Sequence, residues 1–246
     1  MRSLKDSVKA ALRAVGFELR RYNVQTSTDA QLVRALSHLE IDLILDVGAN
    51  SGQYGSALRE HGYRGRIVSF EPSSAAYAAL VRRASGDRNW TVAPRTALGA
   101  SAGTAALNIA GNSVSNSIRG MLPSHRAAAP DSAYVGTEEV PLQALDALAL
   151  QYLAGAYRVL LKIDTQGFED AVLAGAEVSL GKVAAVQVEL SLIPLYEEQL
   201  LFDQMRERLK DLGFNLHALF AVYSDERTGQ TLQLDGLFVR QAISVS

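Results

Sequence analysis

Two acidic side chains in the second half of the chain stand where chemistry could take place. Asp164 follows a short apolar run, and Glu189 lies near the end of another, as expected at the ends of buried strands. Carboxylates in such positions can accept a proton from a substrate or bind a hard cation such as Mg²⁺. The sequence leaves both mechanisms open: Asp164 as a general base, or Asp164, Glu189 and Asp235 as magnesium ligands. His217 is a further candidate base or ligand, and Gln166 can orient an acceptor hydroxyl.

A glycine-bracketed turn near residue 50 predicts a nucleotide-binding loop. The apolar run Leu43–Val47 leads directly into Gly48-Ala49-Asn50-Ser51-Gly52, and a helical pattern follows. The two glycines allow the backbone to approach a ligand closely. A phosphate-binding P-loop needs lysine where the chain has Gln53, and a dinucleotide loop needs glycine where it has Asn50. Asp46, near the end of the strand, suits a ligand with positive charge, such as the sulfonium of S-adenosylmethionine.

A second acid supports an adenosyl ligand. Glu71 ends the next apolar run, nineteen residues after Gly52, where it can accept hydrogen bonds from both ribose hydroxyls. Pro72 fixes the turn that would aim this carboxylate at the ligand. The polar run 112–117 offers hydroxyl and amide groups for a cofactor or a sugar. The predicted cofactor site therefore contains Asp46, Gly48, Asn50, Ser51, Gly52, Tyr54, Glu71, Ser115 and Asn116.

The elements that must position these residues follow a regular order. From residue 42 onward, short apolar runs alternate with helical periods, which predicts a doubly wound α/β fold with helices on both faces of a mostly parallel sheet. Only residues 224–229 join the last two runs, too few for a crossover helix, so these runs predict a C-terminal antiparallel hairpin. The predicted strands are Leu43–Val47, Arg66–Phe70, Trp90–Thr96, Ala105–Ile109, Val140–Leu142, Val159–Ile163, Ala184–Leu190, Leu216–Val222 and Leu232–Val239. The predicted helices are Gln53–His61, Ser74–Arg83, Leu145–Tyr152, Glu169–Leu180 and Leu200–Leu212.

The chain is predicted to divide into an N-terminal helical segment, 1–40, and a single domain, 41–246. Residues 1–22 repeat apolar side chains every three or four positions with basic residues between them, which is typical of an amphipathic basic helix. Such a helix either docks on a membrane surface or partner, or packs on the domain or across a homodimer. Asp29 is predicted to cap a second helix, Ala30–Leu39.

Length and composition restrict the class of protein further. The chain has 246 residues, 48% of them hydrophobic, and no cysteine, which suits one globular core and excludes disulfides and thiolate catalysis. A net charge of −2 argues against a nucleic-acid partner, and no apolar run is long enough for a membrane span. We therefore expect a soluble, cytoplasmic protein. Residues 111–136 show no clear period and predict a long loop, which either closes over the site or is a plain turn-rich connection.

Four blocks of sequence carry a more specific pattern. They are residues 45–54, residues 69–72, residues 97–99, and the run Leu161-Lys162-Ile163-Asp164-Thr165-Gln166-Gly167-Phe168-Glu169, which continues to Val172-Leu173-Ala174-Gly175-Ala176. Together they resemble the FkbM family of S-adenosylmethionine-dependent O-methyltransferases, and the last block is the most specific to it. The resemblance covers residues 40–240 and implies the class I methyltransferase, Rossmann-like fold. Phe168 departs from the small residue often found there, and no acid follows the third strand to bind the adenine amino group.

The resemblance implies transfer of a methyl group to a hydroxyl of a sugar or glycoside, including a mannoside in polysaccharide biosynthesis. Attack by an alcohol on a sulfonium methyl needs either proton removal or a Lewis-acid metal. The implied cofactor is S-adenosylmethionine, with Mg²⁺ on the metal mechanism, and the implied partner is a small-molecule or oligosaccharide acceptor. Two alternatives stay open from the residues alone: an NAD-dependent oxidoreductase and a cofactor-binding module without turnover.

Overall fold

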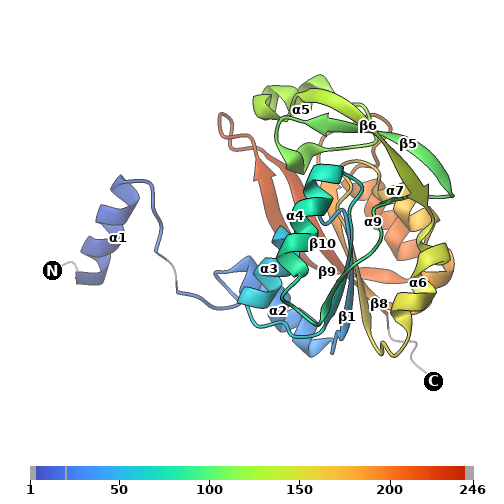
Figure 1. Cartoon of the computed structure of the whole chain (residues 1–246). Coiled ribbons are helices and arrows are strands. Elements are labelled where there is room, and N and C mark those ends of the chain that lie inside the picture. Colours follow the sequence, from blue (N-terminus) through green and yellow to red (C-terminus); the bar gives the residue numbers. More distant parts are fainter. Residues whose placement is uncertain (1–3, 20, 242–246) are drawn as a thin grey trace.

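The computed structural model describes residues 4–19 and 21–241. Its largest element is a seven-stranded sheet with the strand order β3-β2-β1-β7-β8-β10-β9 (Figure 1). The strands from β3 to β8 run parallel, and β10 pairs antiparallel with both β8 and β9. The predicted mostly parallel sheet with a C-terminal antiparallel hairpin is therefore confirmed. The strands are β1 (Leu43–Val47), β2 (Arg66–Phe70), β3 (Trp90–Val92), β7 (Val159–Ile163), β8 (Val183–Ser191), β9 (Phe214–Ser224) and β10 (Thr231–Arg240).

Helices cover both faces of this sheet, as the doubly wound fold requires. Alternate side chains of each strand point to opposite faces, so Ile44 and Leu160 pack against one helical layer and Leu45 and Leu161 against the other. The first layer contains α2 (Thr28–His38), α3 (Gln53–Glu60) and α4 (Ser74–Ala84); the second contains α6 (Leu145–Leu153), α7 (Glu169–Ala174), α8 (Glu177–Leu180) and α9 (Phe202–Asp211). The single helix predicted over 169–180 is wrong, because the chain breaks at Gly175 to pass against the backbone of Gly99.

A second sheet lies across one end of the large one (Figure 1). It has three strands in the order β4-β6-β5, namely β4 (Ala97–Leu98), β5 (Gly103–Ala110) and β6 (Tyr134–Gln143). The strand predicted over Trp90–Thr96 ends at Val92, and β4 belongs to this second sheet instead. The small sheet positions the segment between β5 and β6 above the strand ends.

The long loop predicted at 111–136 is replaced by several short elements. This region contains η1 (Ser113–Ser115), α5 (Pro123–Ala128), η2 (Pro130–Ser132) and the first residues of β6. Helices of one or two turns are too short to produce a recognisable helical period in the sequence, which explains the error. The segment is thus ordered by local helices before it reaches the site.

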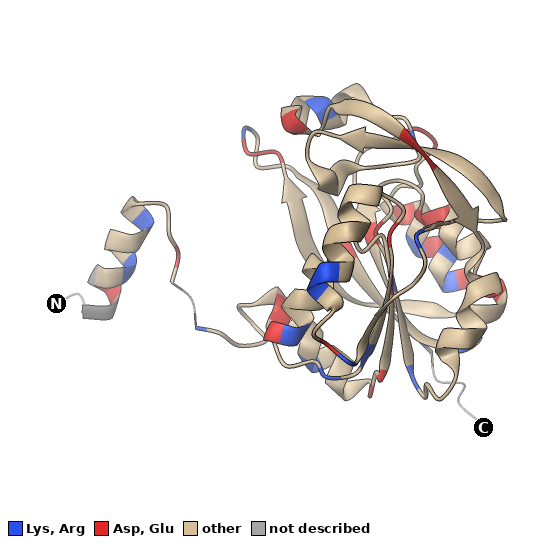
Figure 2. Cartoon of the chain, viewed as in Figure 1, with Lys and Arg blue, Asp and Glu red and all other residues tan. Residues whose placement is uncertain are grey.

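The N-terminal part contributes two helices. The helix α1 (Leu4–Ala14) lies apart from the two sheets (Figure 1), and basic residues lie along it (Figure 2). Residues 1–3 and 20 of the predicted first helix, and residues 242–246, lie outside the described residues. The prediction that Asp29 caps α2 is wrong: the Ser27 side chain accepts from the Ala30 N–H at 3.2 Å. No helix in the described part of the chain is long and apolar enough to cross a membrane.

Candidate functional site

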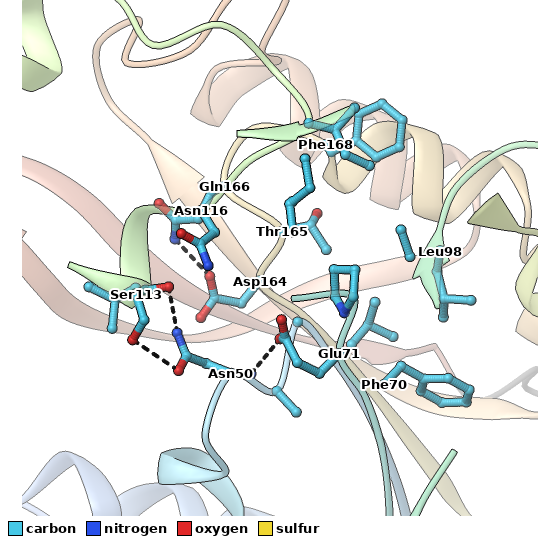
Figure 3. A pocket seen from close by; sticks show the side chains of 18 of the residues that line it. Asn50, Phe70, Glu71, Leu98, Ser113, Asn116, Asp164, Thr165, Gln166 and Phe168 are labelled. Carbon is cyan, nitrogen blue, oxygen red and sulfur yellow. Dashed lines mark hydrogen bonds between the residues drawn. The ribbon is translucent and has the colours of Figure 1, made fainter. Parts of the chain in front are cut away.

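A cavity of about 240 Å³ opens where β1, β2 and β7 end beneath the small sheet. Its walls come from the turns after these three strands, from β4 and β5, and from η1. Figure 3 shows polar side chains on one side of the cavity, Asn50, Ser113, Asp164 and Gln166, and apolar ones on the other, Phe70, Leu98 and Phe168. Such a cavity suits a ligand with a flat apolar ring at one end and polar groups at the other.

The turn after β1 depends on Gly48. Its φ of 75° lies in the left-handed region, and a Cβ here would overlap the backbone carbonyl of Asp164. The N–H groups of Gly48 and Ala49 donate to the Phe70 carbonyl at 3.1 and 3.0 Å. The turn is therefore fixed between β2 and β7, with no room for a side chain at its first position.

Glu71 lies beneath this turn and joins it to the segment after β2. Its Oε2 accepts from the Asn50 N–H and its Oε1 from the Ser73 N–H, both at 2.8 Å. Burial raises the pKa of this carboxyl to about 7, against the opposing effect of the two backbone hydrogen bonds. Each oxygen retains a second lone pair that can accept from a ribose hydroxyl. Glu71 thus orders both loops and fits its predicted role toward an adenosyl group.

The side chain of Asn50 joins the turn after β1 to η1 at the edge of the cavity (Figure 3). Its Nδ2 donates to the Ser113 carbonyl at 2.7 Å, and the Ser113 hydroxyl donates to its Oδ1 at 3.3 Å. Asn50 has a φ of 49°, a conformation that asparagine adopts more readily than most residues. The polar run 112–117 therefore contacts the glycine-bracketed turn directly.

A row of buried polar side chains crosses the large sheet below the cavity. The strand register places Ser69, Asp46 and Lys162 side by side. Trp90 Nε1 donates to Ser69 Oγ, which donates to Asp46 Oδ2, both at 3.0 Å, while Lys162 Nζ lies 3.3 Å from Asp46 Oδ1. Burial lowers the pKa of Lys162, but the charges of Asp164 and Asp46 outweigh it and raise that pKa overall. Asp46 does not line the cavity, so its predicted contact with the cofactor is replaced by a contact with Lys162.

The polar row continues toward β10. The Tyr54 hydroxyl donates to Gln187 Oε1 at 2.7 Å, and Gln187 Nε2 donates to Asp235 Oδ2 at 3.0 Å. The ring of Tyr54 also lies under Lys162, with Nζ 5.1 Å from its centroid. Burial raises the pKa of Asp235 to about 6. Asp235 therefore belongs to a hydrogen-bonded chain that begins at the cavity wall and ends in the sheet.

Asp164 is the carboxylate at the centre of the polar side of the cavity. Its Oδ1 accepts from Gln166 Nε2 at 2.8 Å, and its Oδ2 lies 3.4 Å from Lys162 Nζ. The same Gln166 Nε2 donates to Glu189 Oε2 at 2.9 Å. Burial, followed by the charge of Asp164, raises the pKa of Glu189 well above its usual value. Gln166 thus bridges a carboxylate that faces the cavity and a carboxyl group that lies behind it.

The acid at the end of the Asp-Thr-Gln-Gly-Phe-Glu run shapes the turn that carries Asp164 and Gln166. Glu169 Oε1 accepts from the N–H groups of Thr165 and Gly167 at 2.9 and 3.1 Å. Burial raises the pKa of Glu169 to about 7. Gln166 adopts a φ of 54° within this turn. Glu169 therefore has a structural role, because it closes the tight turn after β7.

The predicted site residues divide by their position relative to the cavity. Ser51 and Gly52 belong to the turn and Ser115 to η1, but they do not line the cavity. A Cβ at Gly52 would meet the side chains of Leu80 and Trp90, so this position packs against the helical layer, and a contact with the cofactor stays a prediction. The predicted residues that do line the cavity are Gly48, Asn50, Tyr54, Glu71, Asn116, Asp164 and Gln166.

Two catalytic predictions are corrected by the structure. His217 lies on β9, which β8 and β10 separate from β7, and it lines a separate surface hollow with Arg34 and His38, so it is neither base nor ligand at this cavity. The predicted magnesium site of Asp164, Glu189 and Asp235 is not formed, because no group of three such side chains in the described residues is placed to hold a metal ion. The Gln166 amide bridges Asp164 and Glu189 instead, and the Gln187 amide donates to Asp235.

Two polar residues of the site received no role from the sequence. Gln187 alternates with Glu189 along β8, and polar residues at every second position of a buried strand are a signal that could have identified it. Tyr196 donates its hydroxyl to Gln166 Oε1 at 2.8 Å. It follows β8 in an irregular segment, and no local pattern indicates this contact.

Comparison with protein families agrees with this geometry. Residues 46–216 match the model of the methyltransferase FkbM domain. The chain belongs to the FkbM methyltransferase family. It is therefore a methyltransferase that uses S-adenosylmethionine, and the alternative of an NAD-dependent oxidoreductase is not supported. No curated protein matches this FkbM methyltransferase at a significant level.

Several solved structures resemble the chain in fold. The methyltransferase domain of bacterial CtHen1 is 10% identical, with 88% of this chain and 100% of that chain covered and a TM-score of 0.48. Magnesium protoporphyrin IX methyltransferase from Synechocystis PCC 6803, with bound S-adenosylmethionine, is 12% identical. The match covers 98% of this chain and 99% of that chain, with a TM-score of 0.47. Fibrillarin from Aeropyrum pernix is 12% identical. The match covers 79% of this chain and 66% of that chain, with a TM-score of 0.44. The acceptor of this FkbM methyltransferase has to be inferred from its own residues.

Proposed function

We propose that this chain transfers the methyl group of S-adenosylmethionine to a hydroxyl of a neutral sugar or glycoside, including a mannoside in polysaccharide biosynthesis. The observation that carries the proposal is the position of Asp164. Glu71 and Asp164 are the two carboxyl groups among the residues that line the cavity, and Glu71 is held by the turns of the cofactor side. Asp164 is then the group available to accept a proton from an oxygen nucleophile.

The cofactor side of the cavity fits an adenosyl group. Glu71 can accept from the ribose hydroxyls, and the apolar wall with Phe70 and Leu98 can enclose the adenine ring. Asn50 and Ser113 on the opposite wall offer amide and hydroxyl groups to the charged amino-acid end. When bound, S-adenosylmethionine supplies a methyl group that is already electrophilic.

The residues around Asp164 account for the proton in this reaction. As the acceptor oxygen forms its bond to the methyl carbon, the carbon–sulfur bond breaks with its electron pair on sulfur, and the hydroxyl proton moves to a carboxylate oxygen of Asp164. Gln166 and Lys162 hold that carboxylate from two sides. Most of the rate enhancement then comes from alignment of the hydroxyl with the methyl group.

The charge of the site favours a neutral acceptor. Lys162 is the single cationic side chain among the lining residues, and it is paired with Asp46 and Asp164. A sugar phosphate, a uronate or an RNA backbone would therefore meet negative charge without an available cation, which costs affinity.

Methyl transfer with labelled S-adenosylmethionine tests the proposal. The panel pairs neutral glycosides and mannosides with their phosphorylated and uronate counterparts, and includes a short RNA. We expect labelled product from neutral glycosides and a fall of about 100-fold in kcat for Asp164→Asn. Transfer confined to RNA would refute the neutral sugar or glycoside as acceptor, and transfer confined to an amine would refute a hydroxyl acceptor altogether. A binding module without turnover would bind S-adenosylhomocysteine in calorimetry and label none of the acceptors.

A further inference from the structure

We propose that Tyr196 is a positioning residue for the acceptor half of the site and acts entirely through Gln166. This inference rests on the proposed function, because it takes Asp164 as the carboxylate that receives the proton. Tyr196 is not among the residues that line the cavity, yet its hydroxyl is 2.8 Å from the side chain of one that is. Tyr196 would thus influence turnover without touching either substrate.

The side chain of Gln166 has its hydrogen-bonding groups committed on both ends. Its Nε2 donates to Asp164 Oδ1 at 2.8 Å and to Glu189 Oε2 at 2.9 Å, and its Oε1 accepts from the Tyr196 hydroxyl at 2.8 Å. An amide has similar shape in its two flipped orientations, so its hydrogen-bond partners decide which one is adopted. The Tyr196 hydroxyl selects the orientation in which the NH₂ group faces the carboxyl groups.

Tyr196 is itself fixed as a donor. Its side chain is 1% exposed, its ring meets the His125 ring edge-to-face with centroids 5.0 Å apart, and Gly167 packs against its Cβ and ring. Burial, and then the charge of Glu189, raises the pKa of the Tyr196 hydroxyl, so the proton stays on the phenol. A hydroxyl that stays protonated beside Gln166 Oε1 donates to it at all physiological pH values.

The backbone of Gln166 is held as firmly as its side chain. Ser117 Oγ donates to the Gln166 carbonyl at 2.6 Å, and Glu169 closes the turn on the other side. Tyr196 is therefore the remaining contact that determines which end of the amide meets Asp164. Without its hydroxyl, the amide can flip and place Oε1 against the carboxyl groups, or leave Oε1 buried and unpaired. Asp164 then loses the donor that sets its orientation toward the acceptor.

Tyr196→Phe removes this hydroxyl and retains the ring that packs on His125. We expect kcat to fall about tenfold or more, because small errors of alignment at the reacting atoms are costly, while the affinity for S-adenosylhomocysteine changes less than twofold. Tyr223→Phe is the matched control. The Tyr223 ring also packs near His125, with ring centroids 6.3 Å apart, and its buried hydroxyl has no hydrogen-bond partner. The control should retain wild-type kcat.

A double-mutant cycle with Gln166→Ala separates positioning from a general packing effect. If Tyr196 acts through Gln166, Tyr196→Phe costs little further activity in the Gln166→Ala background. An undiminished cost in that background, or an equal loss of kcat in Tyr223→Phe, would overturn the proposal.

A readout that does not depend on turnover keeps the two proposals distinguishable. The Gln166 side-chain NH₂ signals in a ¹⁵N NMR spectrum are identified by their loss in Gln166→Ala. We expect slow hydrogen exchange in the wild type and faster exchange in Tyr196→Phe but not in Tyr223→Phe. If no hydroxyl compound is methylated but the Gln166 NH₂ signals exchange as expected, the proposed function is refuted and the role of Tyr196 is not. Unchanged exchange in Tyr196→Phe would remove the role of Tyr196 whatever the acceptor.

Discussion

The protonation of Glu71 should control cofactor affinity near neutral pH. Its carboxyl lies under the glycine-bracketed turn, and burial raises its pKa to about 7. The ionised form offers lone pairs to the ribose hydroxyls, whereas the protonated form has lost part of this capacity. We therefore expect the affinity for S-adenosylhomocysteine to increase as the pH rises from 6 to 8.

The size of this effect follows from the pKa. With a pKa of about 7, roughly 9% of Glu71 is ionised at pH 6 and roughly 91% at pH 8. If the ionised form is the one that binds, the apparent affinity is proportional to its fraction and rises about tenfold over this range. Glu71→Gln keeps an oxygen acceptor of similar size but cannot ionise, so its affinity should be low at pH 8 and nearly independent of pH.

Calorimetric titration of S-adenosylhomocysteine at pH 6, 7 and 8 measures both proteins. Asp235 and Glu169, whose pKa values burial raises to about 6 and about 7, titrate in the same range but are retained in Glu71→Gln. The variant therefore isolates the contribution of Glu71. A tenfold pH dependence that persists in Glu71→Gln, or a flat profile in the wild type, would refute the reasoning.

The raised pKa of Glu71 also affects the stability of the ligand-free protein, but in the opposite direction: cofactor affinity rises with pH, whereas the free energy of unfolding falls. An unfolded glutamate releases its proton near pH 4.5, whereas folded Glu71 retains it up to about pH 7. The folded state thus binds more protons between these values, and the free energy of unfolding decreases as the pH rises through this window. Urea unfolding of the wild type and Glu71→Gln at pH 5 and pH 7.5 should show a smaller decrease for the variant.

Three further predictions follow from single contacts. Gly48→Ala should destabilise the protein by more than about 3 kcal/mol in urea unfolding, because its Cβ would overlap the Asp164 carbonyl, whereas Gly86→Ala, with no atom near its Cβ position, should change stability by about 1 kcal/mol or less. Lys162→Met should cost about 3–5 kcal/mol in the same assay, since it leaves Asp46 buried without its cation, and adding Asp46→Asn should restore part of the loss. Asp164→Asn should leave the calorimetric affinity for S-adenosylhomocysteine within severalfold while kcat for methyl transfer falls about 100-fold; a normal kcat would remove Asp164 from the proton transfer.

The parts of the fold that depend on local sequence could be predicted. The bounds of β1, β2 and β7 agree with the predicted strands, because each is a short apolar run that ends at a turn or a proline. The small sheet could not be predicted in this way. An alternating pattern indicates that β5 and β6 are strands, but it does not show which strand they pair with, and their pairing spans the whole of the segment that contains α5.

In the candidate site too, residues related by local spacing could be predicted, whereas contacts between distant segments could not. The glycine-bracketed turn and Glu71 lie next to each other because β1 and β2 are neighbouring strands, so a spacing rule suffices to relate them. The bonds between Tyr54 and Gln187, and between Tyr196 and Gln166, join segments that no sequence period relates. Carboxyl groups at adjacent strand ends predicted a shared metal, but the sequence does not show that the Gln166 amide bridges Asp164 and Glu189.

These contacts form two groups that should be separable by experiment. Glu71 is bonded to the backbone of the turns on the cofactor side, so changes to it act on S-adenosylmethionine binding. Lys162 connects Asp46, which lies wholly within the sheet, to Asp164 in the cavity, with oxygens 3.3 and 3.4 Å from its Nζ. A substitution at Asp46 should therefore shift the cation that holds the proposed catalytic carboxylate, Asp164, although Asp46 does not line the cavity. It should reduce kcat more than cofactor affinity, which is the reverse of the effect expected from its sequence position at the end of the first strand.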